Sequence, residues 1–222
     1  MTKNITAVIP TRSGSERVKN KNTKPFGDSS LTEIKLKTLL RLREENFIDE
    51  IVVNSNCEKS ITLAKKYSVG FVKRQEFYAS SKCDIRDYWK NVGENVGTKN
   101  FMLCQVTSPL ISFETYVKCI EKFNKENSIL TVTKIKDYIW KGNSPINYLL
   151  PKHPKSQDLP DDLFKLNFGV CVMSVNDIKK WKNLVIPKTE FYYLNDIESI
   201  DIDTELDFSI AEYLYKKYRM VS

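Results

Sequence analysis

Short apolar runs alternate along the chain with stretches of helical periodicity. The apolar runs predict strands at 5–10, 49–56, 70–74, 100–110, 128–135, 169–174 and 189–195. Apolar residues spaced three and four apart predict helices at 30–45, 58–68, 83–95, 112–127, 175–182 and 205–220. This alternation is typical of an α/β fold in which helices flank a mainly parallel central sheet.

Residues 137–165 interrupt the alternation. They show no clear periodicity and contain several prolines. A connection of this length inside a compact domain is usually functional, so we expect an interface arm or a binding segment here. The 222 residues fit a single domain, 1–222, with this stretch as an embellishment.

Three polar segments, 11–22, 105–109 and 201–207, lie next to predicted strands and helices. In open α/β sheets, ligands bind beyond the carboxyl ends of the strands. We therefore expect the three segments to converge on one site.

The first segment belongs to the cationic stretch IPTRSGSERVKNKN at 9–22. Its four cations are Arg12, Arg17, Lys19 and Lys21. Gly14, between two serines, allows the backbone to approach a ligand and direct N–H groups at phosphate oxygens. The stretch matches neither GxxxxGK[ST] nor GxGxxG. By composition alone, a solvated turn explains it equally well.

The last segment, IDIDTELDF, places carboxylates two residues apart. In an extended chain Asp201 and Asp203 share a face, and paired carboxylates suit Mg²⁺. Alternatively, Thr204 or Asp203 caps the final helix, with Glu205 and Asp207 near its positive end. Both interpretations stay open because they can apply to different residues.

The middle segment, QVTSPL at 105–110, gives a weaker signal. Gln105 is suited to hydrogen-bond a substrate hydroxyl or carboxylate, and Thr107 and Ser108 before Pro109 form a natural turn. A plain connection between a strand and a helix explains the same residues.

Composition narrows the classes of partner. No apolar run approaches the roughly 20 residues of a membrane span, and the first ten residues lack the apolar stretch of a signal peptide. We therefore expect a cytoplasmic protein with no membrane partner. The net charge of +7 suits nucleic acid, but the lysines are scattered among acidic residues and form no recognised motif. A solvated surface is the favoured interpretation, with no nucleic-acid partner.

Cysteine and histidine usage narrows the chemistry. The five cysteines are odd in number and show no CxxC spacing, which predicts reduced thiols. The single histidine, His153, excludes a multi-histidine metal site.

Taken together, the motifs resemble those of the acylneuraminate cytidylyltransferases, the CMP-sialic acid synthetases. IPTRSGSERVKNKN is similar to the IPARxGSxRxxxKN signature of that family, and QVTSPL to its QPTSPL. SQDLPDDLFKLNFGV resembles RQDLPxxYxxNGA, and IDIDTELDF is nearly identical to the family's segment. The order and spacing match over nearly the whole chain. CMP-Kdo synthetases are more distant relatives.

The resemblance implies a fold and a reaction. The fold is the Rossmann-related one of nucleotide-diphospho-sugar transferases, with an extension at about 137–190 that forms a homodimer and helps to bind the acceptor. In the reaction, the anomeric hydroxyl of a 2-keto sugar acid of the sialic-acid type attacks the α-phosphorus of CTP. The products are pyrophosphate and a CMP-sugar for surface glycans, and Mg²⁺ is required.

The resemblance also implies roles for single residues. Arg12 and Lys21 hold the triphosphate, Asp201 and Asp203 hold Mg²⁺, and these four are the expected catalytic residues. The other expected nucleotide contacts are Ser15, Asn22, Arg74, Ala79, Ser80 and Asn167. The expected acceptor contacts are Gln105 and Lys141, the latter from the dimer arm.

Departures from the family pattern cluster on the acceptor side. The arginine of RQDLP is Ser156 here, with Lys155 beside it as a candidate replacement. The glycine of NGA is Phe168, the tyrosine of the next strand is Cys171, and Ile111 replaces an arginine. We therefore expect an acidic sugar other than N-acetylneuraminate, such as legionaminate, pseudaminate or a Kdo-like acid. A non-catalytic nucleotide-binding protein on the same fold is the alternative, and the presence of all four expected catalytic residues disfavours it.

Overall fold

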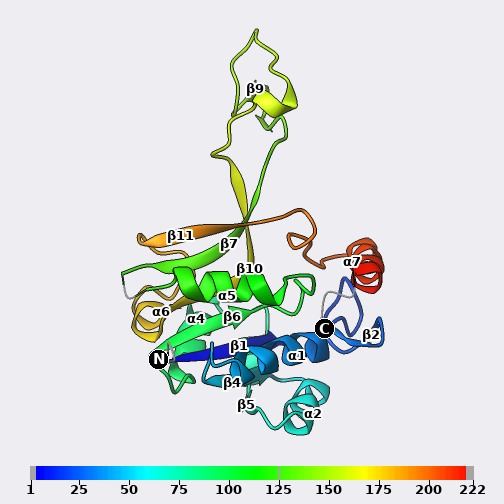
Figure 1. Cartoon of the computed structure of the whole chain (residues 1–222), viewed down its shortest axis with the longest axis vertical. Coiled ribbons are helices and arrows are strands. Elements are labelled where there is room, and N and C mark those ends of the chain that lie inside the picture. The colour runs from blue at the N-terminus through cyan, green and yellow to red at the C-terminus, as the bar shows by residue number, and fades with distance from the viewer. Residues whose placement is uncertain (1–3, 125, 219–222) are drawn as a thin grey trace.

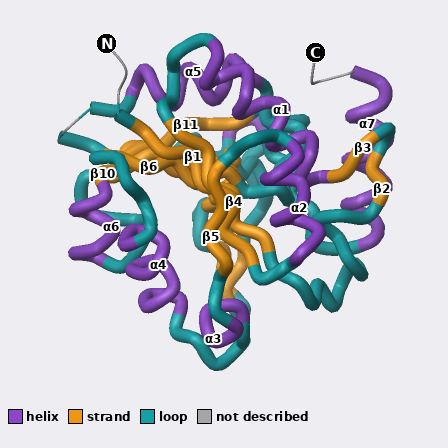
Figure 2. The backbone as a smooth tube through the Cα atoms, turned by 90° about the horizontal axis from the view of Figure 1, so that it is seen from below, coloured by secondary structure: helices purple, strands orange, loops and turns teal. Residues whose placement is uncertain are grey.

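A central sheet of seven strands organises the protein (Figures 1 and 2). The computed structural model describes residues 4–124 and 126–218. In spatial order the strands are β11 (Thr189–Leu194), β7 (Ser128–Lys134), β10 (Phe164–Ser174), β6 (Asn100–Cys104), β1 (Ile5–Thr11), β4 (Glu50–Ser55) and β5 (Gly70–Lys73). β10 runs antiparallel to both of its neighbours, while the other adjacent pairs are parallel. The predicted mainly parallel α/β sheet is confirmed.

Helices cover both faces of the sheet (Figure 2). One face packs against α1 (Leu31–Glu44), α2 (Glu58–Lys66), α5 (Phe113–Lys122) and α7 (Glu205–Tyr218), and the other against α4 (Ile85–Glu94) and α6 (Val175–Trp181). Strand side chains alternate between the two cores, since Ala7 and Ile9 of β1 join the first and Val8 the second. Burial on both faces explains why the strand sequences are continuous apolar runs.

The smaller elements are α3 (Glu76–Ala79), the paired β2 (Pro25–Phe26) and β3 (Ser29–Ser30), the paired β8 (Trp140–Lys141) and β9 (Ser144–Pro145), and a 3-10 turn, Ser156–Asp158. No helix within the described ranges combines the length and apolar character needed to cross a bilayer. All five cysteines are free, as the sequence predicts.

An arm formed by residues 135–163 projects from the sheet along the long axis of the molecule (Figure 1). It leaves from the end of β7 and returns into β10. The Ile135 N–H donates to the Leu163 carbonyl (2.9 Å) where the two ends of the arm meet the sheet. Tyr138 stacks on His153 within the arm, with ring centroids 4.9 Å apart. The stretch without periodicity therefore forms a separate projection.

β10 is longer than the predicted strand 169–174, because Phe164–Leu166 already pair with β7. The pairing then shifts register between Leu166 and Cys171, and Phe168 adopts a left-handed conformation (φ 54°). This irregularity breaks the apolar alternation, so the pattern reveals only the second half of the strand. The predicted helix 205–220 is confirmed to Tyr218; its last two positions lie outside the described residues.

Candidate active site

Asn22 fixes the cationic loop after β1 through a hydrogen bond to its backbone. This side chain is buried, and its Nδ2 donates to the Arg12 carbonyl (3.1 Å), while its own carbonyl accepts from the Thr32 hydroxyl (2.8 Å). At the tip, the Ser13 N–H donates to Asn56 Oδ1 (2.9 Å). Gly14 has a φ of +77° with open space around its Cα, so the backbone conformation explains the glycine. Asn22 thus fixes the direction in which Arg12 leaves the strand.

Lys21 connects this loop to the aspartate segment, which is distant in sequence. Its Nζ donates to the carbonyl of Ile202 and lies 4.0 Å from Asp203 Oδ1. Burial lowers the pKa of Lys21, and the nearby Asp203 and Asp201 partly oppose that shift. Arg17 pairs with the same Asp203 oxygen at 2.7 Å, but both side chains are about half exposed or more. The cationic and acidic motifs therefore meet in the fold.

The aspartate segment divides between two roles. The Thr204 hydroxyl accepts from the Asp207 N–H (3.2 Å), and the Asp207 carboxylate accepts from the Thr204 N–H (2.7 Å), which caps α7 reciprocally. The Thr204 hydroxyl also lies 2.8 Å from the Asp207 carboxylate, and its hydrogen bond to that carboxylate, with the bonds from the Thr204 and Asp203 N–H groups, lowers the pKa of Asp207. Asp201 lies apart from the cap near the Ser108 hydroxyl (3.5 Å), and burial raises its pKa. The capping interpretation is therefore confirmed for Thr204 and Asp207, while the expected role of Asp201 and Asp203 in holding Mg²⁺ stays a prediction.

Arg74 lies on the opposite side of the loop from the aspartates. It is buried, and it donates from Nε to Asn54 Oδ1 (2.7 Å) and from Nη2 to the Tyr88 hydroxyl (2.8 Å). Burial lowers the pKa of Arg74 and raises that of Tyr88 to about 12. Arg12 bridges toward the same side, because its Nη1 donates to the carbonyl of Ala79 (3.1 Å).

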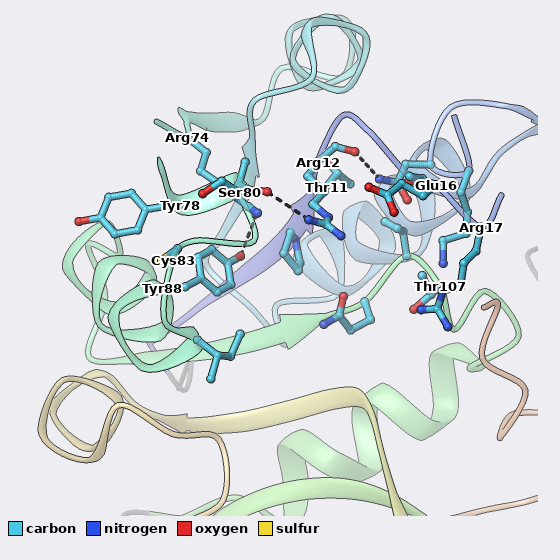
Figure 3. Close-up of a pocket in the computed structure, with 18 of the residues that line it drawn as sticks. Thr11, Arg12, Glu16, Arg17, Arg74, Tyr78, Ser80, Cys83, Tyr88 and Thr107 are labelled. Carbon is cyan, nitrogen blue, oxygen red and sulfur yellow. Dashed lines mark hydrogen bonds between the residues drawn. The ribbon is translucent and has the colours of Figure 1, made fainter. Parts of the chain in front are cut away.

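A cavity of about 440 Å³ lies between these groups. Figure 3 shows Arg74, Tyr78, Ser80, Cys83 and Tyr88 on one side, Glu16, Arg17 and Thr107 on the other, and Arg12 between them. The expected site residues that line this first cavity are Arg12, Ser15, Lys21, Asn22, Arg74, Ala79, Ser80 and Gln105. Expected site residues from three separate stretches of sequence, 12–22, 74–80 and 105, therefore line one cavity.

A second cavity adjoins the first, and a third adjoins the second. The second, of about 450 Å³, shares Gln105 and Thr107 with it and reaches Asn167 and Asp201. The third, of about 530 Å³, is bordered by Asn167 and both aspartates. Lys141 lies in the arm and lines none of the three.

The acceptor-side departures have different places in the fold. Ser156 lies in the arm. Cys171 belongs to β10 and its side chain is buried in the core, and Ile111 is buried against Gly169. Phe168 alone among these four departures lines the second and third cavities.

Asn167, which lines the second and third cavities, has a side-chain amide donor without a partner among the described residues. Its Oδ1 accepts from the Thr131 hydroxyl (2.8 Å) and the Gly169 N–H (2.9 Å), which fixes the orientation of the amide. Within the described part of the chain, its buried Nδ2 has no hydrogen-bond partner. A buried donor without a partner costs about 1–3 kcal/mol, a cost that a bound ligand would remove.

Several residues that line the first cavity were not among the site residues expected from the sequence. Thr107 belongs to the recognised QVTSPL motif, and Arg17 to the cationic loop, so both had a signal. Tyr78, Tyr88 and Trp89 had none, because they resemble ordinary apolar positions of α3 and α4.

The acidic groups fit a hard divalent ion only in part. Across residues 4–124 and 126–218, no group of three or more His, Cys, Asp or Glu side chains is placed to hold a metal. Mg²⁺ commonly takes one or two protein carboxylates together with phosphate oxygens and water. Asp201 and Asp203 therefore fit an ion that arrives with a triphosphate.

Comparison with known proteins decides the family. The cytidylyltransferase family model matches residues 6–147, which is most of the chain. This chain belongs to the cytidylyltransferase family. It is a nucleotidyltransferase enzyme, and the family expected from its motifs is confirmed.

Curated relatives of this cytidylyltransferase match along nearly the full length of this chain. It is 27% identical to the CMP-N,N'-diacetyllegionaminic acid synthase of Legionella pneumophila over 95% of each chain. It is 26% identical to the pseudaminic acid cytidylyltransferase of Campylobacter jejuni over 94% of this chain and 95% of the relative. An Escherichia coli N-acylneuraminate cytidylyltransferase is 22% identical over 96% of this chain but 52% of the relative.

Solved structures confirm the fold. A 4-diphosphocytidyl-2C-methyl-D-erythritol synthase from Anaerococcus prevotii superposes with a TM-score of 0.70 at 16% identity, over 96% of both chains. A CMP:2-keto-3-deoxy-manno-octonic acid synthetase complexed with CTP gives 0.68 at 10% identity, over 97% of this chain and all of the other. At such identities, the likeness concerns the cytidylyltransferase fold alone.

Proposed function

We propose that this cytidylyltransferase transfers CMP from CTP to the anomeric hydroxyl of a 2-keto sugar acid of the nonulosonic type, for surface glycans. The observation that carries the proposal is that Lys21, which lines the first cavity together with Arg12, lies 4.0 Å from Asp203. Asp201 lines the second cavity, which adjoins the first, and both aspartates line the third. Relatives named for legionaminic, pseudaminic and acylneuraminic acids support the acceptor class.

The cations act on the triphosphate. In the first cavity, Arg12 and Lys21 are placed to bind the phosphates and to stabilise the charge that develops as pyrophosphate leaves. The anomeric oxygen forms a bond to the α-phosphorus, the bond from that phosphorus to the bridging oxygen breaks, and the hydroxyl proton passes to solvent. Lys21 also holds the Ile202 carbonyl, so one side chain aligns the phosphate loop with the aspartates.

Asp201 and Asp203 would hold Mg²⁺. The ion would neutralise phosphate oxygens and lower the pKa of the attacking hydroxyl. Asp203 is paired with Arg17 through exposed side chains, and such pairs contribute only about 0–1 kcal/mol. Releasing Asp203 to a cation therefore costs little.

Pyrophosphate release tests the proposal directly. The protein is incubated with CTP, Mg²⁺ and a panel of sialic, legionaminic, pseudaminic and Kdo-type acids, with products identified by mass. UTP and ATP in place of CTP test the base, and a chelator tests the metal. CTP binding without turnover of any acid would favour the non-catalytic alternative. Turnover of N-acetylneuraminate equal to or faster than that of the other acids would refute the expected change of acceptor.

We also propose a homodimer formed through the arm. Trp140, Ile146, Leu149 and Leu150 expose 48–79% of their surface on this projection, and clustered exposed apolar side chains mark interaction sites. Lys141 stands beside them, so its expected contact with the acceptor would be made across the interface. Light scattering of the wild type and of Leu149→Asp tests the assembly; a monomeric wild type would refute it.

A further inference from the structure

The second cavity combines apolar walls with cations. It lies between α4, the loop after α6 and the irregular part of β10. Trp89, Phe168 and Leu184 form its apolar side, and Arg86 and Lys182 are its cationic lining residues. Asp201 is its one lining carboxylate among the described residues. Because it also borders the first cavity at Gln105 and Thr107, a molecule bound here lies next to the triphosphate.

Two residues of this cavity have unusual backbone conformations. Phe168 (φ 54°) and Lys182 (φ 52°) are both left-handed. Asparagine tolerates that region, and three of the other non-glycine examples are asparagines, but a bulky residue there is an outlier. The left-handed conformation costs roughly 1–2 kcal/mol per residue. Lys182 is the left-handed residue that ends α6, where its N–H donates to the Ile178 carbonyl (2.8 Å), a common way for a helix to end. Phe168 has no such role, and strain of this kind concentrates at ligand sites.

Close packing explains why β10 keeps this shape. A Cβ on Gly169 would lie 2.5 Å from Ile111 Cδ1 and 3.0 Å from Ser108 Oγ. The strand is therefore pressed against the turn that carries Ser108, and the adjacent register shift directs Phe168 toward the cavities.

The two cations are not committed to strong partners. Lys182 Nζ lies 4.0 Å from Asp87 Oδ1, with the Asp87 side chain about half exposed. The Arg86 guanidinium makes no hydrogen bond or ion pair with any described residue. Both are therefore free to bind an anion, and a guanidinium binds a carboxylate with paired hydrogen bonds.

We propose that Lys182 and Arg86 bind the carboxylate of the acceptor acid, from the same subunit that binds the nucleotide, with Phe168 as the apolar wall that contributes to acceptor selectivity. The assignment rests on the proposed function. It gives the carboxylate two cations within one subunit, in a chain that has Ser156 in place of the family's arginine. Asn167 lines both the second and the third cavity beside Phe168.

Steady-state kinetics with varied acceptor test the proposal. Lys182→Asn removes the charge and suits the left-handed backbone, and Lys182→Arg keeps the charge. Arg86→Met removes the second charge, and Lys90→Met, one turn further along α4, is the matched control. For the double variant Lys182→Asn/Arg86→Met, we expect the acceptor KM to rise about tenfold to a hundredfold. The KM for CTP, CTP affinity by calorimetry and melting temperature should stay within error of the wild type.

A second comparison identifies the group that is recognised. The methyl ester of the best acceptor lacks the carboxylate charge, so it should be a much poorer substrate than the acid for the wild type. The double variant should use ester and acid about equally. An unchanged acceptor KM in the double variant, or the same preference for acid over ester as the wild type, overturns the assignment while leaving the proposed function intact. Failure of the wild type to use any acid, with CTP still bound, overturns both.

Discussion

Lys35 of α1 places an ammonium group in the protein core. The residue is 1% exposed, and its Nζ donates to the Ser108 carbonyl (2.9 Å) and to the Tyr116 hydroxyl (2.5 Å). Burial lowers the pKa of Lys35 from 10.5 to about 8, although Cys104 and Glu198 oppose the shift. We predict that the free energy of unfolding gains a rising contribution above pH 8, and that Lys35→Met abolishes this contribution.

The sign follows from proton linkage. Between about pH 8 and 10.5 the unfolded chain keeps the proton that the folded protein has lost, so raising the pH stabilises the fold. With these two pKa values, the gain from pH 7.5 to 9.5 is about 2 kcal/mol. A neutral amine still has two N–H donors, so both hydrogen bonds survive the titration.

Urea unfolding followed by circular dichroism at pH 7.5, 8.5 and 9.5 measures this contribution. The wild type is compared with Lys35→Met and with Lys37→Met, which removes an exposed lysine of the same helix. Other groups titrate in this range, but their effects largely cancel in the difference between two proteins. In Lys35→Met, two buried acceptors lose their donor at a cost of about 1–3 kcal/mol each; this cost does not depend on pH and leaves the slope unaffected.

The expected result is a wild-type advantage over Lys35→Met that increases by about 2 kcal/mol between pH 7.5 and 9.5, with Lys37→Met parallel to the wild type. Parallel behaviour of the wild type and Lys35→Met would refute the reasoning, since it would mean that the ammonium keeps its ordinary pKa in the fold.

Three further substitutions separate catalysis from packing. Asp203→Asn should lower kcat by about a hundredfold or more, while the melting temperature changes little because its pair with Arg17 is exposed; substantial Mg²⁺-dependent turnover would exclude a metal role. Lys21→Ala should lower kcat/KM by a similar factor and Lys19→Ala only slightly, as measured by pyrophosphate release, and equal effects would remove Lys21 from the site. Gly169→Ala should destabilise the protein by about 1–3 kcal/mol through overpacking, measured by urea unfolding, and an unchanged midpoint would show that the turn beside it yields freely.

The sequence predicts the sheet and the convergence of its motifs because both depend on local patterns. Apolar runs mark the buried strands, and polar segments at the sheet edge mark the site. The direction of β10 could not be predicted, because a strand buried on both faces reads alike in parallel and antiparallel sheets. Its left-handed Phe168 also lacked a signal, since that conformation normally selects glycine or asparagine.

Side-chain contacts between segments that are distant in sequence could not be predicted either. Ser112 caps α5, and three residues later Thr115 provides only half of a capping box, so the sequence predicts an incomplete cap. Glu198, 86 residues away from Ser112, completes it by accepting from the Ser112 N–H (2.9 Å) and the Thr115 hydroxyl (2.8 Å). The position of Lys141 in the arm could be expected from the family resemblance, while its contact with the acceptor stays a prediction.

The joint between arm and sheet makes the arm a replaceable module. The two ends of the arm leave the sheet beside the paired residues Lys134 and Phe164, and the Ile135–Leu163 hydrogen bond closes the joint. The ends of the projection are thus already at hairpin distance, so an Asn-Gly turn could join them without disturbing the β7–β10 register. A chain shortened at this joint would keep the seven-stranded sheet and the first cavity, so the proposed assembly could be tested separately from the nucleotide chemistry.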